Sequence, residues 1–245
     1  MSAATAEGSH AATLTALPSL DTSRDCYTFP ANNWVCPAFL SDYRVEITDA
    51  LVEHVWLTAA TVLIGVALSI PLALLARRSS TLESALLGSS TILYTVPSLA
   101  MFSLLVPFTG LSATTVVVGL VLYSLTILVR NTLAGLRAVP DDVRDSARGL
   151  GYGPAKLLLR IELPLAVPVI MAGVRVATVS TVALVTIGYI VDYGGLGTLI
   201  ALGLDTDFKA QVLTASVLCV VLAVLLDAVL LGLQRVLTPW TRARV

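Results

Sequence analysis

Five long apolar segments constrain this chain more than any other feature of its sequence. They cover, approximately, residues 54–76, 86–107, 112–129, 165–191 and 210–233. A helix needs about 20 mostly apolar residues to cross the hydrocarbon core of a bilayer. The composition agrees, because 56% of the 245 residues are hydrophobic, only 13% are charged and the mean hydropathy is +0.88. We therefore predict an all-α membrane protein with about five transmembrane helices in contact with lipid.

The basic residues outside these segments are unevenly distributed. Those that follow the first, third and fifth segments are Arg77, Arg78, Arg130, Arg137, Arg144, Arg148, Lys156, Arg160, Arg235, Arg242 and Arg244. The opposite side carries only Arg24, Arg44 and Lys209. Cytoplasmic loops are enriched in Lys and Arg. We therefore expect a multi-pass protein of the cytoplasmic (inner) membrane with its N-terminus outside and its C-terminus in the cytoplasm.

The loop of residues 137–164, between the third and fourth segments, is polar and forms helices by its own signals. Pro140 suits the first turn of a helix, and Asp141 and Asp142 lie where the positive end of the helix dipole favours carboxylates. Gly151 can end that helix, and Pro154 can begin a second one that we expect over residues 155–163. The apolar residues of the first helix, Val143, Ala147 and Leu150, fall on one face. The loop is thus predicted to be a helix-turn-helix knob on the cytoplasmic side.

The run DSARGLGYGPAKLLLRIELP resembles the signature loop of ABC importer permeases, which has an E-A-A-like start, a Gly four residues later and a closing I-x-L-P. The matching residues are Asp145, Ser146, Ala147, Gly151, Ile161, Leu163 and Pro164. Asp145 replaces the more usual Glu and Ser146 the first Ala, and both changes are mild. The resemblance implies that the knob couples to a cytoplasmic ATPase, and we expect Leu150 and Tyr152 to be its apolar anchors. Arg148, Lys156 and Arg160 would lie at the rim, either as salt-bridge partners or only as topology signals.

Further runs resemble permeases that import quaternary ammonium compatible solutes such as glycine betaine, choline or carnitine. They are ALVEHVWLTAATVLIGVALSIPLALLARR, LPLAVPVIMAGVRVAT, GGLGTLI and LLDAVLLGLQRVLTPW, and the resemblance covers residues 34–240. It implies a type I ABC importer transmembrane domain that works by alternating access. It also implies a second permease subunit, identical or homologous, two ABC ATPase subunits and an extracytoplasmic substrate-binding protein. ATP and Mg would be bound by the ATPase subunits, so we expect no enzyme activity and no cofactor in this chain.

Other classes have less support in the sequence. It has no phosphate-binding loop, no HExxH and no cluster of metal-ligand residues, and its only histidines are His10 and His54. A net charge of −1 gives no support for nucleic-acid binding. Within the class, the alternative is a permease for another small solute, such as methionine or a different amino acid. A secondary transporter or channel is the alternative from outside the class, and the loop motif argues against it.

Several residues within or beside the apolar segments are candidates for a gate or pore. Arg175 lies in the cytoplasmic half of the fourth segment, where a charge is costly unless it is paired, faces the interior or snorkels to the interface. It therefore has either a structural role, with Asp227 as a candidate partner, or a role at the gate. Gly194, Gly195 and Gly197 form either a closely packed turn or an outer hinge. The tyrosines are either interface anchors or cation–π contacts for a quaternary amine, and they are Tyr94, Tyr123, Tyr189 and Tyr193.

The first fifty residues differ from the rest and have no signal-peptide pattern. We divide the chain into an extracytoplasmic tail over 1–50 that is partly disordered, a permease domain over 51–240 and a cytoplasmic tail over 241–245. Cys26 and Cys36 lie on the side where thiols oxidise. They either form a disulfide or stay as two free thiols. Cys219, in the fifth segment, needs no chemistry.

Overall fold

The computed structural model describes Cys26 and residues 31–240. The predictions of a flexible start and of a cytoplasmic tail over 241–245 therefore lie outside the described residues. Within the described part the chain is helical and contains no strand. A short helix, α1 (Pro37–Asp42), precedes a bundle with four helices that are long and apolar enough to cross a membrane: α2 (Arg44–Ala76), α5 (Ala113–Arg137), the continuous stretch Pro154–Val191 and α10 (Lys209–Leu237).

The second predicted segment is not one straight helix. It forms α3 (Ser80–Thr95) and α4 (Ser98–Thr109), which are bent by 100° relative to each other and count as at most one broken span. Pro97 causes the break, because a proline lacks the backbone N–H and forces the preceding residue out of the helical region. Val96 is accordingly extended, with φ −66° and ψ 128°, and its carbonyl accepts a hydrogen bond from the Tyr123 hydroxyl. The prediction of about five spans is thus confirmed as four continuous helices plus this one broken pair.

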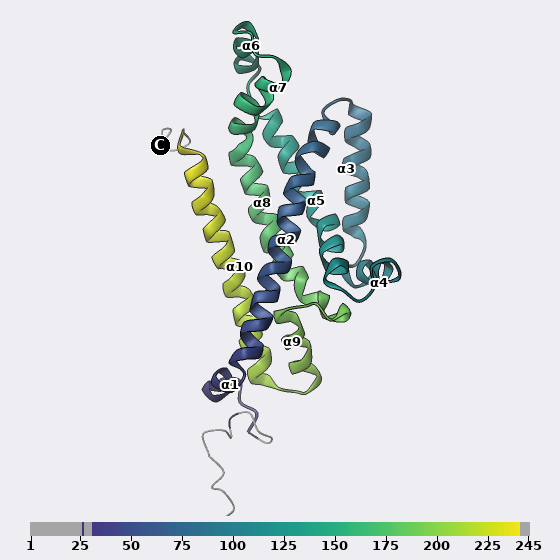
Figure 1. The fold of residues 1–245 in the computed structure, drawn as a ribbon, viewed down its shortest axis with the longest axis vertical. Helices are drawn as coiled ribbons and strands as arrows, with labels where there is room; N and C mark the ends of the chain where they lie inside the picture. Colours follow the sequence, from purple (N-terminus) through teal and green to yellow (C-terminus); the bar gives the residue numbers. More distant parts are fainter. Residues whose placement is uncertain (1–25, 27–30, 241–245) are drawn as a thin grey trace, which may run out of the picture.

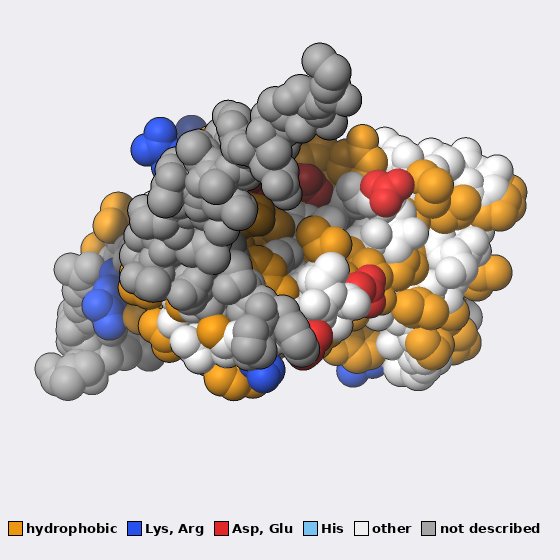
Figure 2. Space-filling model, turned by 90° about the horizontal axis from the view of Figure 1, so that it is seen from below, with side chains coloured by type: hydrophobic (Ala, Val, Ile, Leu, Met, Phe, Trp, Pro, Cys, Tyr) orange, Lys and Arg blue, Asp and Glu red, His pale blue; other side chains and the backbone are white. Residues whose placement is uncertain are grey.

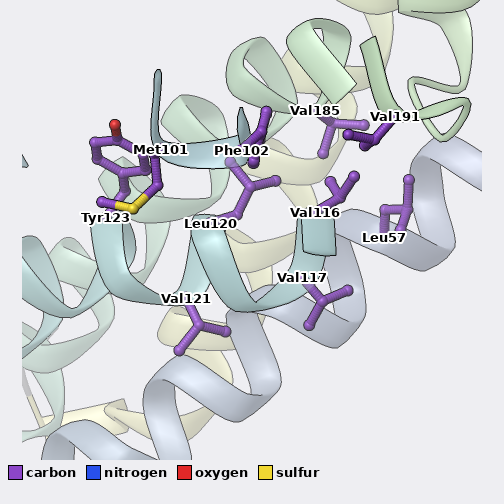
Figure 3. Packing of buried hydrophobic residues seen from close by; sticks show 10 residues of the cluster. All are labelled: Leu57, Met101, Phe102, Val116, Val117, Leu120, Val121, Tyr123, Val185 and Val191. Atoms are coloured by element: carbon purple, nitrogen blue, oxygen red, sulfur yellow. The ribbon is translucent and has the colours of Figure 1, made fainter. Parts of the chain in front are cut away.

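Helix α5 is the centre of the bundle. It packs mainly against α2 and α8 (Leu163–Val185), with α3 and α4 on another side (Figure 1). One apolar cluster joins α5 to α2, α4 and the end of the fourth span (Figure 3), and its buried members are Leu57, Met101, Phe102, Val116, Val117, Leu120, Val121, Tyr123, Val185 and Val191. Gly119 lets Phe102 approach, since a Cβ there would lie 2.8 Å from the ring. This packing holds the broken pair against the centre of the bundle.

The fourth span is longer than predicted. It begins in the polar loop with α7 (Pro154–Leu157), continues through a π-helical turn (Leu158–Glu162) and α8, and ends in a 3₁₀ turn (Thr186–Val191). The second helix of the loop was predicted to end at Leu163, and this boundary is wrong. The π-helical turn directly before Pro164 changes the hydrogen-bond register, with the Leu163 N–H bonded to the Leu158 carbonyl, and the helix continues through this proline. The loop and the span are therefore one continuous rod.

The end of the bundle opposite the knob also differs from expectation. The region predicted as a Gly-rich turn contains a helix, α9 (Leu196–Asp205), that packs on α10. Helix α2 begins at Arg44, so the domain boundary drawn at residue 50 falls within a helix. Seen from this end, acidic side chains lie scattered among apolar ones (Figure 2). Arg44 and Lys209 begin helices here, whereas Arg77 and Arg235 lie toward the knob end (Figure 1).

Candidate functional site

The polar loop folds into the predicted helix-turn-helix knob, which projects beyond the bundle at one end (Figure 1). Its first helix is α6 (Asp141–Gly149), and α7 follows after a tight joint. The Gly151 N–H donates to the Arg148 carbonyl at 2.9 Å and the Tyr152 N–H to the Ala147 carbonyl at 3.1 Å. These two bonds form a Schellman motif, which requires a left-handed residue after the helix cap. Gly151 is that residue, with φ +81°.

An apolar groove runs along the knob. It has a volume of about 350 Å³ and is lined by Asp142, Val143, Ser146, Ala147, Leu150, Tyr152 and Ile161. The side of α6 that carries Val143, Ala147 and Leu150 thus faces the groove, as the helical spacing predicts. Leu150 is 80% exposed, which is unusual for a leucine on a polar loop. An exposed apolar patch with a polar surround marks a surface that another element covers.

The basic residues of the knob have specific neighbours. Arg148 pairs with Asp145 at 2.9 Å, and both side chains are exposed, so this pair contributes little to stability. The ammonium group of Lys156 lies 4.2 Å from the centre of the Tyr152 ring, which is a cation–π contact. Lys156 therefore contacts one of the residues that line the groove, without lining the groove itself. Asp145, although it starts the signature motif, forms only this exposed side-chain pair with Arg148 within the described part of the chain.

The root of the knob is held by a charge network that the sequence analysis missed. Glu162, in the π-helical turn, accepts two hydrogen bonds from Arg77 at 2.8 and 3.0 Å and one from Arg144 Nε at 2.9 Å. Arg144 also donates to the Leu136 carbonyl at 2.7 Å and to Asp141 at 2.6 Å. The Glu162 side chain is only 6% exposed. Its hydrogen bonds raise the pKa of Arg77 above its ordinary value, so this guanidinium stays charged.

The network connects the end of α2, the end of α5, helix α6 and the start of the fourth span. Leu163 and Pro164 lie directly after it, and Leu163 packs against a small cluster around Ala73, Leu136 and Ala166. A π turn lets the chain add one residue and turn a side chain inward, and such turns are frequent at functional sites. Glu162 occupies the variable position of I-x-L-P. The motif therefore gave no indication that this residue pairs with Arg77 and Arg144. The only signal in the sequence was a carboxylate, close to Arg160, in a run that is otherwise apolar.

The candidate gate residues separate into two places. Arg175 on α8 pairs with Asp227 on α10, with N–O distances of 2.7 and 2.8 Å, and so has the partner that the sequence left open. Tyr189 lies in the 3₁₀ turn (Thr186–Val191), and the three glycines lie at or just before the start of α9, the helix at the end of the bundle opposite the knob (Figure 1). There a Cβ on Gly197 would lie 2.2 Å from the Thr186 carbonyl oxygen, and one on Gly195 2.7 Å from the Cβ of His54. These contacts favour close packing over a hinge, with Gly194 and Gly195 in the turn and Gly197 in the first turn of α9.

The described part of the tail is attached to the same end. Cys26 and Cys36 are bonded to each other, with their Cα atoms 5.5 Å apart. Cys36 is buried in a cluster with Phe39, Ile47 and Ala210. Asn32 accepts a hydrogen bond from the Lys209 N–H at 3.1 Å, at the start of α10. The tail therefore fixes α1 against the first turns of α2 and α10.

Comparison with known proteins decides the family. The family of binding-protein-dependent transport system inner membrane components matches residues 65–243. This chain belongs to that family. The permease is thus an integral inner-membrane protein, and the match includes both the knob and the ion pair between α8 and α10.

Relatives with assigned transport roles agree with this placement. The permease is 33% identical to the choline transport system permease protein OpuBB of Bacillus subtilis, over 82% of this chain and 93% of that protein. It is 36% identical to the osmoprotectant import permease protein OsmW of Salmonella typhimurium, over 82% of this chain and 96% of that protein. Among solved structures, the MetNI methionine ABC transporter matches with a TM-score of 0.73 at 18% identity, over 80% of this chain and 98% of that chain. That likeness shows the fold, which is the type I ABC importer transmembrane domain predicted from the sequence.

Proposed function

We propose that this permease imports a quaternary ammonium osmoprotectant, such as glycine betaine, choline or carnitine, by ATP-driven alternating access. The single observation that supports this most is the identity of 30–36% to transport permeases named for choline, carnitine, glycine betaine or osmoprotectants. The chain covers more than four fifths of their length, so the likeness is not limited to one motif. The similarity to the methionine transporter is at the level of fold and does not favour an amino acid.

The partners follow from the two ends of the molecule. A cytoplasmic ABC ATPase receives the knob, with the groove around Leu150 and Tyr152 as the contact, and a second permease completes the pathway. An extracytoplasmic binding protein delivers the solute to the end that carries α9 and the tail. The distribution of basic residues supports an outside N-terminus and a cytoplasmic C-terminus.

The geometry of the knob supports a mechanical role for it. Because the knob and the fourth span are continuous from Pro154 to Val191, a displacement of α6 and α7 is transmitted directly to α8. The Glu162 network adds α2 and α5 to the same lever. ATP binding and hydrolysis on the partner subunits would thus move three spans together.

Uptake by the whole transporter tests the function. The permease and its neighbouring ATPase and binding-protein genes are expressed in cells that lack other osmoprotectant uptake, and entry of labelled glycine betaine, carnitine and choline is measured. We expect ATP-dependent uptake of at least one of the three, unaffected by excess methionine. Uptake of methionine, or of none of the three quaternary amines, contradicts the proposal. A variant ATPase without its catalytic carboxylate is the control for ATP dependence.

A further inference from the structure

The ion pair between Arg175 and Asp227 is not packed away inside the bundle. Its side chains keep 27% and 34% of their surface exposed. They line one groove of about 460 Å³, whose other walls are Ala172, Val176, Val179 and Ser180. Each guanidinium nitrogen in the pair, Nε and one terminal nitrogen, contacts its own carboxylate oxygen, at 2.8 and 2.7 Å. A positive and a negative group are thus held side by side at an open groove.

The depth of this groove makes its exposure informative. Arg175 lies in the middle of α8 (Leu163–Val185), and Asp227 lies within the apolar helix α10. Charged groups at this depth are costly unless they face a water-filled cavity or a protein partner, and in transporters they mark the path of the solute. Taking charged groups out of contact with polar surroundings is costly, so the exposed edge of this pair is better matched by water or a polar molecule than by lipid or apolar side chains. The open groove therefore favours a polar molecule in contact with the pair.

We propose that this groove is a transit site for a zwitterionic solute, and that Arg175 and Asp227 are its specificity-determining residues. The proposal rests on the proposed function and adds the class of solute. A solute carboxylate would accept hydrogen bonds from the exposed edge of the Arg175 guanidinium. A quaternary ammonium group cannot donate a hydrogen bond, so it would lie beside the Asp227 carboxylate with its methyl groups against Val176 and Val179.

The charges explain why the site would favour a zwitterion. The ion pair and a zwitterion such as glycine betaine or carnitine each have a net charge of zero, and their dipoles attract each other when they are antiparallel. Binding then leaves no net charge in the membrane. Choline has the ammonium group but no carboxylate, so it contacts Asp227 and gains nothing from Arg175. The two residues are thereby expected to act differently on the two kinds of solute.

Two variants of the whole transporter test this in the uptake assay. The first variant, Arg175→Gln, keeps Asp227 and removes the guanidinium that would bind the carboxylate of the solute. We expect uptake of glycine betaine and carnitine to fall about tenfold or more, as for a lost charge-assisted hydrogen bond, while choline uptake falls much less. The second exchanges the charges, Arg175→Asp with Asp227→Arg. It keeps an ion pair between α8 and α10 but reverses its dipole, and we expect uptake of both zwitterions to fall about tenfold or more.

The control exchanges another Arg–carboxylate pair, Glu83→Arg with Arg137→Glu, which joins α3 to the end of α5 and does not line the groove. We expect it to transport like the original protein. Amounts of assembled complex are compared by purification through the ATPase. Assembled charge-exchange protein with unchanged uptake, or an Arg175→Gln variant whose ratio of betaine to choline uptake is unchanged, overturns the transit site. If the charge-exchange variant does not assemble, the ratio of betaine to choline uptake in the Arg175→Gln variant alone decides whether the transit site exists. A wild-type transporter that carries no quaternary amine refutes the proposed function instead.

Discussion

Gly151 is the residue at which the knob changes direction. Its φ of +81° is unfavourable for residues with a side chain, and a Cβ would meet nothing within 4 Å, so the cost of substitution is in the backbone alone. Gly151→Ala should cost the joint about 1 kcal/mol and reduce substrate-stimulated ATPase activity several-fold. Gly149→Ala is the matched control, since Gly149 is equally open but lies within α6. Equal activity of the two variants would show that the left-handed joint does not matter for coupling.

Glu162 is the buried charge on which the attachment of the knob depends. Glu162→Gln removes the charge but keeps the shape, and leaves Arg77 and Arg144 with a weaker partner. Breaking a buried ion pair typically costs about 3–5 kcal/mol. We therefore expect a lower unfolding temperature of the purified permease in detergent and a loss of coupled ATPase activity.

Glu83→Gln provides the comparison for that prediction. Glu83 also pairs with one arginine, Arg137, but that arginine is 56% exposed, and exposed pairs contribute about 0–1 kcal/mol. The unfolding temperature of the Glu83→Gln variant should therefore differ little from that of the original protein. If both variants unfolded at the same temperature as the original protein, the Glu162 network would not hold the knob.

At the scale of elements, the bond between Cys26 and Cys36 ties the tail to the residue that directly precedes α1. Mass spectrometry of protein that has not been reduced should detect this cross-link, and a thiol reagent that cannot pass the membrane should label neither cysteine of intact cells before reduction. Cys219, a free thiol in α10, is the internal control. Free alkylation of both tail cysteines contradicts the bond. Labelling of the tail only after permeabilisation contradicts the topology.

The elements that the sequence predicted well are those with strong local signals. Apolar length located the spans, and Pro140, Gly151 and Pro154 located the turn of the knob. Pro97 marks a place where a helix can break, but the bend of 100° and the hydrogen bond from the Tyr123 hydroxyl to the Val96 carbonyl are tertiary features that the local sequence does not give. Helix α9 was not predicted because it is short and has glycines at its start, which usually indicate a turn. The glycines are needed there because Gly197 packs against Thr186 and Gly195 against His54.

The site residues show the same division. The groove on the knob was predictable, since Val143, Ala147 and Leu150 recur at helical spacing. The Glu162 network and the pairing of Arg175 with Asp227 join residues that lie 85 and 52 positions apart, and no local rule gives such distances. For Arg175, the charge within an apolar segment indicated that a partner was required and Asp227 was a candidate, whereas nothing in the sequence pointed to the partners of Glu162.

For the molecule as a whole, the knob is the feature that distinguishes an ATP-driven permease from a transporter that works alone. Leu150 and Tyr152 line its groove, and central apolar anchors of an interface each contribute about 2 kcal/mol or more. Leu159 is the matched control, because it is 64% exposed and lies on the same segment but outside the groove. Lys156 is unsuitable as a control because it contacts the Tyr152 ring.

The most direct test is therefore purification of the complex through the permease, with the amount of bound ATPase measured for each variant. Truncating Leu150 and Tyr152 together to Ala should release the ATPase from the solubilised complex and abolish solute uptake, whereas Leu159→Ala should retain both. A double truncation that still binds the ATPase and transports would contradict the central claim that this knob couples ATP hydrolysis to transport.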